Sequence, residues 1–221
     1  MFSALPISLA NLTAFFEQIL PGVKVALELF SLTLIFSIPL GVIIAMGRLS
    51  SLKIIAQVSR IYIYIVRATP LMLQLIFVYF GLGSLGLNID RFLVAVITFV
   101  LNYAAYFAEI FRSGIQSIER SQFESAEVLG LSYWQTMRYI ILPQTIKRIL
   151  PPIGNEVISL IKDTSLAQVI GVVEIFTVVK ITATRDFVIY PFLIAAVFYL
   201  LMTYIFTRIF MSLEKYYNYY E

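Results

Sequence analysis

Polar and ionisable side chains recur at helical spacing inside segments of this sequence that are otherwise apolar. One set is seven residues apart, which places it on one face if the segment is a single helix: Arg60, Arg67 and Gln74. A second set has steps of four, three and four: Asn102, Tyr106, Glu109 and Ser113. A third segment carries two pairs at spacing seven, Asn155 with Lys162 and Glu156 with Asp163. Groups of these types bind polar or charged ligands, and carboxylates also transfer protons.

The composition decides which other chemistry is available. Cysteine and histidine are both absent, which excludes disulfides, thiol nucleophiles, zinc sites built on those residues and histidine acid–base catalysis. Hydrophobic residues make up 60% of the 221 residues and charged residues only 13%, about half the usual share of a soluble domain. The net charge of +3 comes without a basic block long enough to hold a phosphate backbone. It therefore indicates basic cytoplasmic loops of a membrane protein rather than a nucleic-acid surface.

Five stretches are long and apolar enough to cross about 30 Å of hydrocarbon, which takes roughly 20 residues. They are residues 25–46, a segment within 54–83, 92–108 with an extension to 112, 139–180 and 187–207. The fourth is interrupted by charges and prolines: Lys147, Arg148, Glu156, Lys162, Asp163, Glu174, Pro143, Pro151 and Pro152. Because each charge in lipid costs at least ~2.5 kcal/mol, this span must face protein or a watery cavity. We expect an all-α integral membrane protein with about five transmembrane helices in a single domain, residues 1–221.

The ends of the chain and its loops predict an orientation. Residues 1–20 carry apolar side chains at helical spacing, so we expect a short interfacial helix that ends at Pro21-Gly22. With five spans the termini lie on opposite sides of the membrane. Basic residues are more frequent in one set of connections (Arg48, Lys53, Arg112, Arg120, Arg138, Lys215) than in the other (Lys24, Arg91, Lys180, Arg185). We therefore place the N-terminus outside and the C-terminus in the cytoplasm.

The connection before the fourth span has a pattern of helix starts and stops. Ser121 with Glu124 and Ser132 with Gln135 each form a capping-box pattern. Gly130 fits the left-handed residue that ends a helix. The pattern predicts a short helix, a sharp turn and the start of the next helix on the cytoplasmic side.

Two interpretations of this connection stay open. The short helix is either an ordinary link on the membrane surface or a rigid peg for a partner protein, with Phe123, Ala126 and Gly130 near its contact face. Pro143 removes a helix hydrogen bond and should kink the fourth span. That kink either transmits motion as a hinge or only bends the helix around its neighbours.

The same segment resembles the EAA signature of bacterial ATP-binding-cassette importer permeases, E-A-A-x3-G-x9-I-x-L-P. The matching residues are Glu124-Ser125-Ala126, Gly130, Ile140 and Leu142-Pro143, with Ser125 where alanine is usual. Other stretches resemble elements of polar amino acid permeases: Arg67-Ala68-Thr69-Pro70-Leu71 (alanine replacing the usual glycine), Ala108-Glu109-Ile110, Arg112-Ser113-Gly114-Ile115 and Lys162-Asp163-Thr164-Ser165-Leu166. The resemblance covers about residues 20–215.

This resemblance implies a permease subunit of an importer for polar amino acids, with the type I importer transmembrane fold, in the bacterial cell membrane. Residues 121–135 would be the coupling helix that docks in an ATPase subunit, and the residues assigned to coupling are Glu124, Ala126, Gly130, Leu142 and Pro143. The implied partners are two ATPase subunits, a second permease copy or paralogue, an extracytoplasmic binding protein, the amino acid and membrane lipid, without nucleic acid. The chain has no GxxxxGK[ST] phosphate-binding loop, so we expect no cofactor in it and ATP with Mg²⁺ on the partner.

The substrate would meet the polar side chains of the spans. The candidate substrate-binding residues are Arg67, Gln74, Asn102, Tyr106, Glu109, Glu156, Asp163, Thr164 and Ser165. The alternative is that these groups satisfy one another, for example Arg67 with Glu109 as a buried ion pair. Acidic groups favour a basic amino acid of the arginine, lysine or histidine type, whereas Arg67 and Lys162 weigh against it.

Asp163-Thr164-Ser165 has the residue types of a helix start. We expect a new helix after Thr164 or Ser165 whose free N–H groups suit the carboxylate of an amino acid. The alternative is a capped helix end that only shapes the bundle.

Two other function classes remain possible on the sequence. An ion-coupled secondary transporter would use Glu109 or Asp163 as its proton or sodium site, although the two related halves typical of such proteins are not visible. A membrane-embedded enzyme would use Glu109, Glu156 or Asp163 as acid or base, without help from histidine or cysteine.

Overall fold

The computed structural model describes residues 9–217, and all the regular secondary structure in that range is helical. The helices are α1 (Leu9–Leu49), α2 (Lys53–Ala68), α3 (Leu71–Ser84), α4 (Arg91–Gln116), α5 (Arg120–Val128), α6 (Tyr133–Thr136), α7 (Leu142–Asp163), α8 (Ile175–Asp186) and α9 (Tyr190–Tyr217). A π-helical segment, Met137–Ile141, precedes α7, and a 3-10 segment, Thr164–Ile170, follows it. The expectation of an all-α protein is confirmed.

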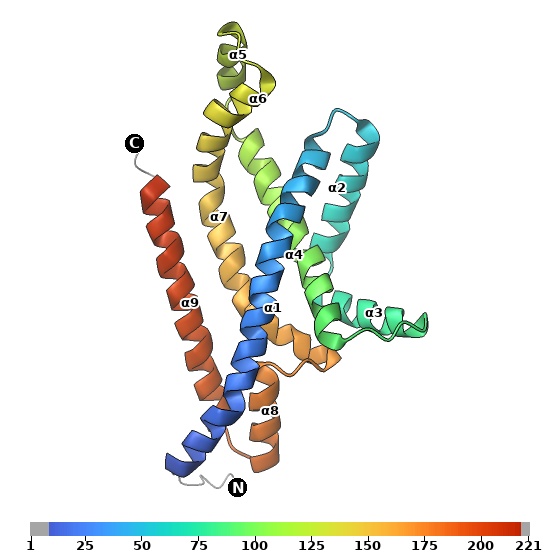
Figure 1. The fold of residues 1–221 in the computed structure, drawn as a ribbon, viewed down its shortest axis with the longest axis vertical. Helices are drawn as coiled ribbons and strands as arrows, with labels where there is room; N and C mark the ends of the chain where they lie inside the picture. The colour runs from blue at the N-terminus through green and yellow to red at the C-terminus, as the bar shows by residue number, and fades with distance from the viewer. Residues whose placement is uncertain (1–8, 218–221) are drawn as a thin grey trace.

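Within the described residues, three helices are long and apolar enough to cross a membrane on their own: Phe15–Leu49, Arg91–Gln116 and Tyr190–Tyr217. Two bent pairs pass the same test together, Lys53–Ala68 with Leu71–Ser84 and Tyr133–Ile170 with Ile175–Asp186. Counting each bent pair as one span gives five, which agrees with the predicted number. The helices of the long bundle run between the α5–α6 end and the α8 end of the molecule (Figure 1).

The expected helix break at Pro21-Gly22 does not occur. Helix α1 continues through Pro21 without interruption, and residues 1–8 lie outside the described range. Before the proline, Phe15 and Ile19 are buried against Ile175 and Val179 of α8. This burial of apolar area on both sides of the proline outweighs the hydrogen bond that the proline removes.

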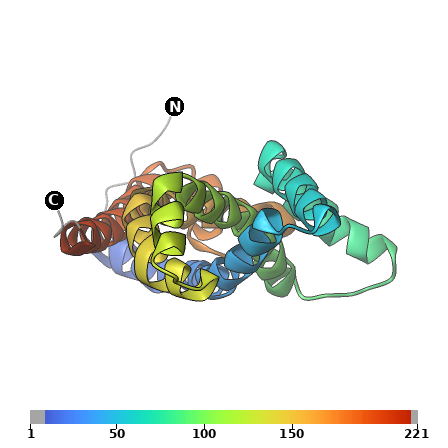
Figure 2. The same cartoon turned by 90° about the horizontal axis from the view of Figure 1, so that it is seen from above.

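The predicted second span is two helices that meet at 106°. Pro70 lacks an N–H group and disfavours helical geometry in the residue before it. Thr69 accordingly has extended backbone angles, φ −114° and ψ 141°. Helix α3 therefore leaves the bundle sideways (Figures 1 and 2). The prediction that Gln74 shares one helical face with Arg60 and Arg67 is wrong, because Gln74 lies on α3.

Helix α4 is the central helix of the fold and packs against α1, α2, α3 and α7. Glycines allow the closest approaches. A Cβ atom on Gly41 of α1 would lie 2.8 Å from Phe107 Cβ, and one on Gly114 of α4 would lie 2.1 Å from Ile149 Cγ2 of α7. Small residues at helix crossings are typical of membrane proteins, where close packing replaces the hydrophobic effect between helices.

The fourth span changes its helical geometry twice. The π segment ends at Ile141, two residues before Pro143, so the helical geometry changes beside this proline; the predicted kink of the span stays a prediction. Helix α7 then continues into the 3-10 segment without a new start. The chain turns at Gly171, which has φ +83°, and α8 follows at an angle of 58°.

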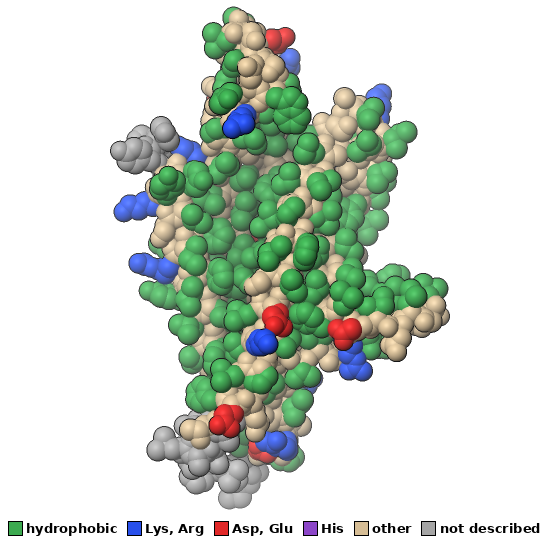
Figure 3. Space-filling model, in the orientation of Figure 1, with side chains coloured by type: hydrophobic (Ala, Val, Ile, Leu, Met, Phe, Trp, Pro, Cys, Tyr) green, Lys and Arg blue, Asp and Glu red, His purple; other side chains and the backbone are tan. Residues whose placement is uncertain are grey.

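The outer surface is mostly apolar, as lipid contact requires. In the view of Figure 3, hydrophobic side chains cover most of the bundle. Most charged side chains lie at its ends and along its margin, and one acidic and one basic side chain lie side by side on the apolar face.

Candidate functional site

Gln74 and Asn102 meet at the break between α2 and α3. The Gln74 amide nitrogen lies within bonding distance of three oxygens at the end of α2: Val66 O (2.9 Å), Thr69 O (3.2 Å) and Thr69 Oγ1 (2.8 Å). Its Oε1 atom accepts a hydrogen bond from Asn102 Nδ2 on α4 at 3.1 Å. Asn102 is only 3% exposed, so this bond satisfies a buried amide. Gln74 thus both caps α2 and ties α3 to α4.

Asp163 is held by a residue that the spacing analysis missed. The Tyr103 hydroxyl donates to Asp163 Oδ2 at 2.7 Å, joining α4 to the end of α7. Tyr103 is 2% exposed and its ring stacks on Phe99. It follows Asn102 directly, so it lies on a different face of α4 from the predicted polar stripe. Tyr103 can be recognised as the partner of Asp163 only from the packing of α7 against α4.

Arg67 and Glu109 do not form the ion pair considered as an alternative. Glu109 pairs instead with Arg112 on its own helix, at 2.5 Å (Oε1 to Nη2) and 2.9 Å (Oε2 to Nε). The Arg67 guanidinium lies over the ring of Tyr106, 5.3 Å from its centroid. Arg67 is exposed in the single chain and exerts an electrostatic attraction on Glu156. The charge of Glu109 is therefore balanced by Arg112, which lies one turn nearer the α5–α6 end of α4 and farther from Asn102.

The helix start expected at Asp163-Thr164-Ser165 is absent. The Thr164 N–H donates to Leu160 O, which continues the helical bonding of α7. The Thr164 hydroxyl donates to Ile161 O (2.8 Å) and the Ser165 hydroxyl to Lys162 O (2.7 Å). Neither hydroxyl caps a helix, because the chain stays helical through this point. No set of free N–H groups is available here for a carboxylate, and that part of the prediction is wrong.

Six residues make up what we call the central polar cluster: the hydrogen-bonded pair Gln74 and Asn102, and a second group of Arg67, Tyr103, Glu156 and Asp163, which is linked by the Tyr103–Asp163 bond and by electrostatic interactions. Glu156 and Asp163 are half-buried on α7, about 10 Å apart along the helix axis. Tyr103 interacts electrostatically with both carboxylates. The next face of α7 is open, since Asn155 and Lys162 are exposed. The cluster combines one guanidinium, two carboxylates and two amides, which suits a small ligand with charges of both signs.

The predicted starts of the two short helices agree with the structure at one position and not at the other. Helix α5 begins after Glu119, so its cap residue lies two residues earlier than the expected Ser121, and the Ser121–Glu124 capping box is not formed. Ser121 donates to Glu119 Oε2 at 3.2 Å, and Glu124 pairs with Arg120 at 2.9 Å. Because Ser121 and Glu124 bond to the side chains of Glu119 and Arg120, they do not bond to the backbone N–H groups as a capping box requires.

The turn after α5 and the start of α6 follow the prediction. Gly130 has φ +73°, and the N–H groups of Gly130 and Leu131 donate to Glu127 O (2.9 Å) and Ala126 O (3.1 Å). This is the bonding pattern of a Schellman turn. Ser132 and Gln135 form the expected capping box, with bonds of 3.4 Å and 2.8 Å.

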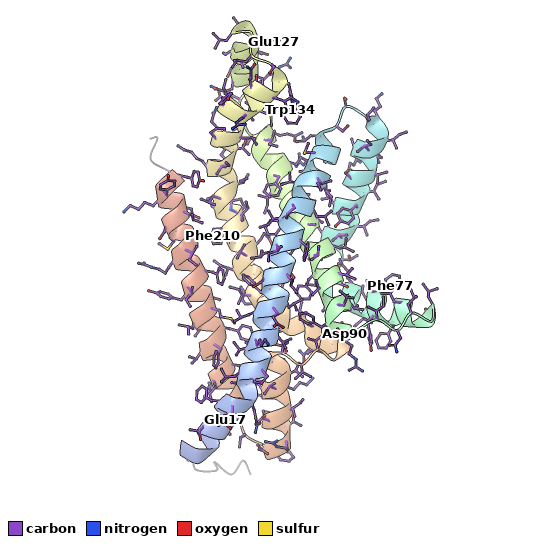
Figure 4. The ribbon with its side chains drawn as sticks, in the orientation of Figure 1. Glu17, Phe77, Asp90, Glu127, Trp134 and Phe210 are labelled. Carbon is purple, nitrogen blue, oxygen red and sulfur yellow. The ribbon has the colours of Figure 1, made fainter. Side chains whose placement is uncertain are left out.

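The α5–α6 loop stands at one end of the molecule with an apolar surface, and Figure 4 labels Glu127 and Trp134 there. Exposed side chains on it are Val128 (88%), Leu129 (75%), Tyr133 (67%) and Trp134 (71%). Ala126, in contrast, is fully buried, so its predicted place on a contact face is wrong. Ala126 packs inward and supports the loop, while the neighbouring apolar residues are free to contact another protein.

Comparisons with known proteins agree with this architecture. The family model of the binding-protein-dependent transport system inner membrane component matches residues 37–217. The chain is similar to a probable amino-acid ABC transporter permease protein, YckA of Bacillus subtilis, with 40% identity over 172 residues (78% of this chain and 76% of the relative). It is 37% identical over 200 residues to the glutamine transport system permease protein GlnP of Escherichia coli K12 (89% and 91%). It is 35% identical over 199 residues to the arginine transport system permease protein ArtQ of Bacillus subtilis (89% and 91%).

Solved structures give the same result for the fold. The crystal structure of an amino acid ABC transporter with histidines superimposes with a TM-score of 0.87 at 34% identity, covering 95% of this chain and 98% of that one. An inward facing structure of the MetNI methionine ABC transporter gives a TM-score of 0.70 at 15% identity, covering 96% and 99%. At that identity the second likeness concerns the fold alone.

Proposed function

This chain belongs to the family of binding-protein-dependent transport system inner membrane components, and we propose that it binds a basic amino acid in its central polar cluster during import. It is a membrane-embedded amino acid ABC importer permease subunit, not an enzyme, and ATP is hydrolysed by a separate ATPase. Family membership decides against the secondary-transporter and membrane-enzyme alternatives.

The observation that carries the substrate proposal is the convergence of polar groups from four helices. The Gln74–Asn102 bond joins α3 to α4, and the Tyr103–Asp163 bond joins α4 to α7. Arg67 reaches the same region from α2. Ionisable groups inside a membrane bundle are expensive, and their usual reason is a substrate or ion pathway.

The charges of the cluster suggest a role for each group. Arg67 is the group that can bind the α-carboxylate, because guanidinium matches a carboxylate in two parallel hydrogen bonds. Asp163 and Glu156 would bind the α-ammonium group and a second, side-chain cation. One cation and two carboxylates complement a ligand with two cations and one carboxylate, which is an amino acid of the arginine or lysine type. Lys162, next to Asp163 on the exposed face of α7, opposes this preference, so the test below includes neutral amino acids.

Exposed polar groups at membrane depth support a second permease copy. Arg67, Asn155 and Lys162 are exposed in the single chain, and lipid would not tolerate them. A homodimer, or a heterodimer with a paralogue, would cover them and enclose a watery cavity between the two clusters.

The α5–α6 loop is proposed as the contact for the ATPase, which would bind ATP and Mg²⁺. Glu124 lies exposed on α5, Gly130 forms the turn and Ala126 supports the loop from inside. Leu142 and Pro143 follow the π segment at the start of α7, in a position to transmit loop motion to the cluster. The orientation proposed is N-terminus outside and C-terminus cytoplasmic. It is supported by α9, which ends toward the α5–α6 end, whereas α1 begins at the opposite end (Figure 1).

The test uses the complete transporter in liposomes, with this chain, its ATPase and its binding protein. Uptake of labelled L-arginine, L-lysine, L-histidine, L-glutamine and L-cystine is measured together with ATP hydrolysis. We expect uptake of a basic amino acid that Asp163→Asn reduces severely, while Asp186→Asn, at the exposed end of α8, leaves it unchanged. Uptake confined to neutral amino acids would contradict the basic preference, and equal uptake by the two variants would contradict the cluster as the substrate site.

A further inference from the structure

Two charged side chains lie on the outer side of α1, inside a segment that is long and apolar enough to cross the membrane. Lys24 and Glu28 have side chains that are 77% and 47% exposed, and they approach each other to 3.7 Å (Nζ to Oε1). An exposed ion pair contributes little to stability, and lysine before glutamate is the less favourable order on a helix. Each charge is therefore open to a further partner, which lipid hydrocarbon cannot supply.

The Lys24–Glu28 pair faces away from the central polar cluster. Helix α1 packs on α4 where a Cβ atom on Gly41 would lie 2.8 Å from Phe107 Cβ. Phe107 and Glu109 are two residues apart, about 200° around the helix, so α1 covers the side of α4 opposite its polar stripe. The pair in turn lies about 200° around α1 from the buried Ala26 and Phe30. A cavity between the polar clusters of two copies would therefore leave this side of α1 to the lipid.

A groove lies beside the pair, between α1 and the start of α4. Its volume is about 650 Å³, within the range of pockets that hold small ligands. Lys24, Glu28 and Ser31 are its polar lining. The rest of the lining is apolar and consists of Leu20, Val23, Leu27, Leu32 and Phe92. A ligand that complements the groove has charges of both signs next to an apolar chain.

Phe92 shows that the groove lies at one end of a membrane span. It is the second residue of α4, which is long and apolar enough to cross the membrane on its own. Asp90 caps this helix and accepts hydrogen bonds from the N–H groups of Phe92 (3.0 Å) and Leu93 (3.1 Å). Figure 4 labels Asp90 at the end of α4 that points away from the α5–α6 loop. Because a span ends where hydrocarbon meets the lipid headgroups, headgroups are available at the level of the groove.

We propose that this groove binds one phospholipid with a primary ammonium headgroup, of the phosphatidylethanolamine type. Lys24 binds the phosphate, Glu28 accepts hydrogen bonds from the ammonium group, and the acyl chains lie along the apolar lining. Hydrogen bonds between charged groups are the strong ones. A choline headgroup carries the same charges but has no N–H group to donate, so Glu28 selects ethanolamine over choline. This lipid site is separate from the proposed substrate site.

The experiment measures lipid binding to the complete transporter in detergent by native mass spectrometry. The probes are phosphatidylethanolamine, phosphatidylcholine and phosphatidylglycerol with identical acyl chains. We expect one ethanolamine lipid per copy of this chain, bound about tenfold more tightly than the choline lipid, which is the effect of one hydrogen bond to a charged group. Glu28→Leu should abolish this preference, whereas Lys24→Met should weaken the binding of both lipids.

The chain offers a matched control in the ion pair of Arg185 with Asp186, at the exposed end of α8. Arg185→Met and Asp186→Leu remove the same kinds of charge there and should change neither affinity. Equal affinity of the wild type for ethanolamine and choline lipids, or a preference that survives in Glu28→Leu, would overturn the proposal. Tightest binding of phosphatidylglycerol would assign the groove to Lys24 alone and would overturn it as well.

A second measurement tests whether another copy of the chain covers the groove instead of lipid. The chain contains no cysteine, so Leu27→Cys places a single thiol in the groove. We expect no disulfide between two copies under oxidising conditions in the membrane, and a disulfide-linked dimer would overturn the lipid site. Amino acid uptake is not part of either readout, so failure of the proposed function would leave both results unchanged.

Discussion

Replacing Gly130 by alanine should weaken the contact with the ATPase through the backbone alone. Gly130 has φ +73°, and no atom lies within 4 Å of a Cβ built on it. A side chain there meets no steric obstacle, so the cost comes only from the left-handed backbone, about 1–2 kcal/mol for a residue with a Cβ atom. A penalty of this size reduces the population of the correct turn by about 5- to 30-fold.

The chain offers a matched control for this change. Gly86, in the loop between α3 and α4, has φ +78° and no atom within 4 Å of a built Cβ. Gly86→Ala therefore introduces the same backbone strain far from the α5–α6 loop. Gly130→Asn is the second control, because asparagine adopts the left-handed conformation more readily than alanine.

Two measurements test this reasoning: the affinity of the permease for its ATPase in detergent, and ATP hydrolysis stimulated by the loaded binding protein in liposomes. We expect Gly130→Ala to weaken the affinity by up to about 30-fold, Gly130→Asn to weaken it less, and Gly86→Ala to leave it unchanged. Equal losses for Gly130→Ala and Gly86→Ala would refute the assignment of the loop to coupling. An asparagine variant as weak as the alanine variant would refute the backbone explanation.

Three further changes have definite expected results. Gly114→Ala drives a Cβ atom to 2.1 Å from Ile149 and should destabilise the protein by about 1–3 kcal/mol, seen as a lower thermal midpoint. Adding Ile149→Ala should recover part of it, and a double variant no better than the single one would contradict the steric cause. Tyr103→Phe removes the 2.7 Å bond to Asp163 and should reduce uptake several-fold; wild-type uptake would exclude a positioning role. Ser132→Ala removes the α6 cap and should cost about 1 kcal/mol, whereas Ser132→Asn should cost less; similar ATPase affinity for both would show that the cap does not matter for docking.

Some features follow directly from the sequence because their causes are local or general. Five spans could be counted, since lipid requires long apolar segments wherever the chain crosses it. The Gly130 turn and the Ser132–Gln135 cap were also predictable. Each depends on residues within one turn of chain, and few other conformations satisfy the same groups.

Other local signals gave wrong predictions because packing competes with them. Ser121 had the residue type of a cap but bonds Glu119 instead. Thr164 had the type of a helix start but is buried at 1% exposure inside a continuing helix. Pro21 was expected to end a helix, yet α1 passes through it with its apolar side chains packed on α8. Burial on a neighbouring helix outweighed the preference of the single residue in the last two cases.

The sequence by itself determined that this protein is a helical membrane bundle with a structured loop before its fourth span, because hydropathy and capping act over short stretches of chain. Only the tertiary structure decided which polar groups meet. Tyr103 and Asp163 are 60 residues apart, and Gln74 and Asn102 are 28 apart. Such contacts depend on how far each helix is rotated and tilted against its neighbours. Spacing along one helix fixes which residues share a face, but it does not fix what that face touches.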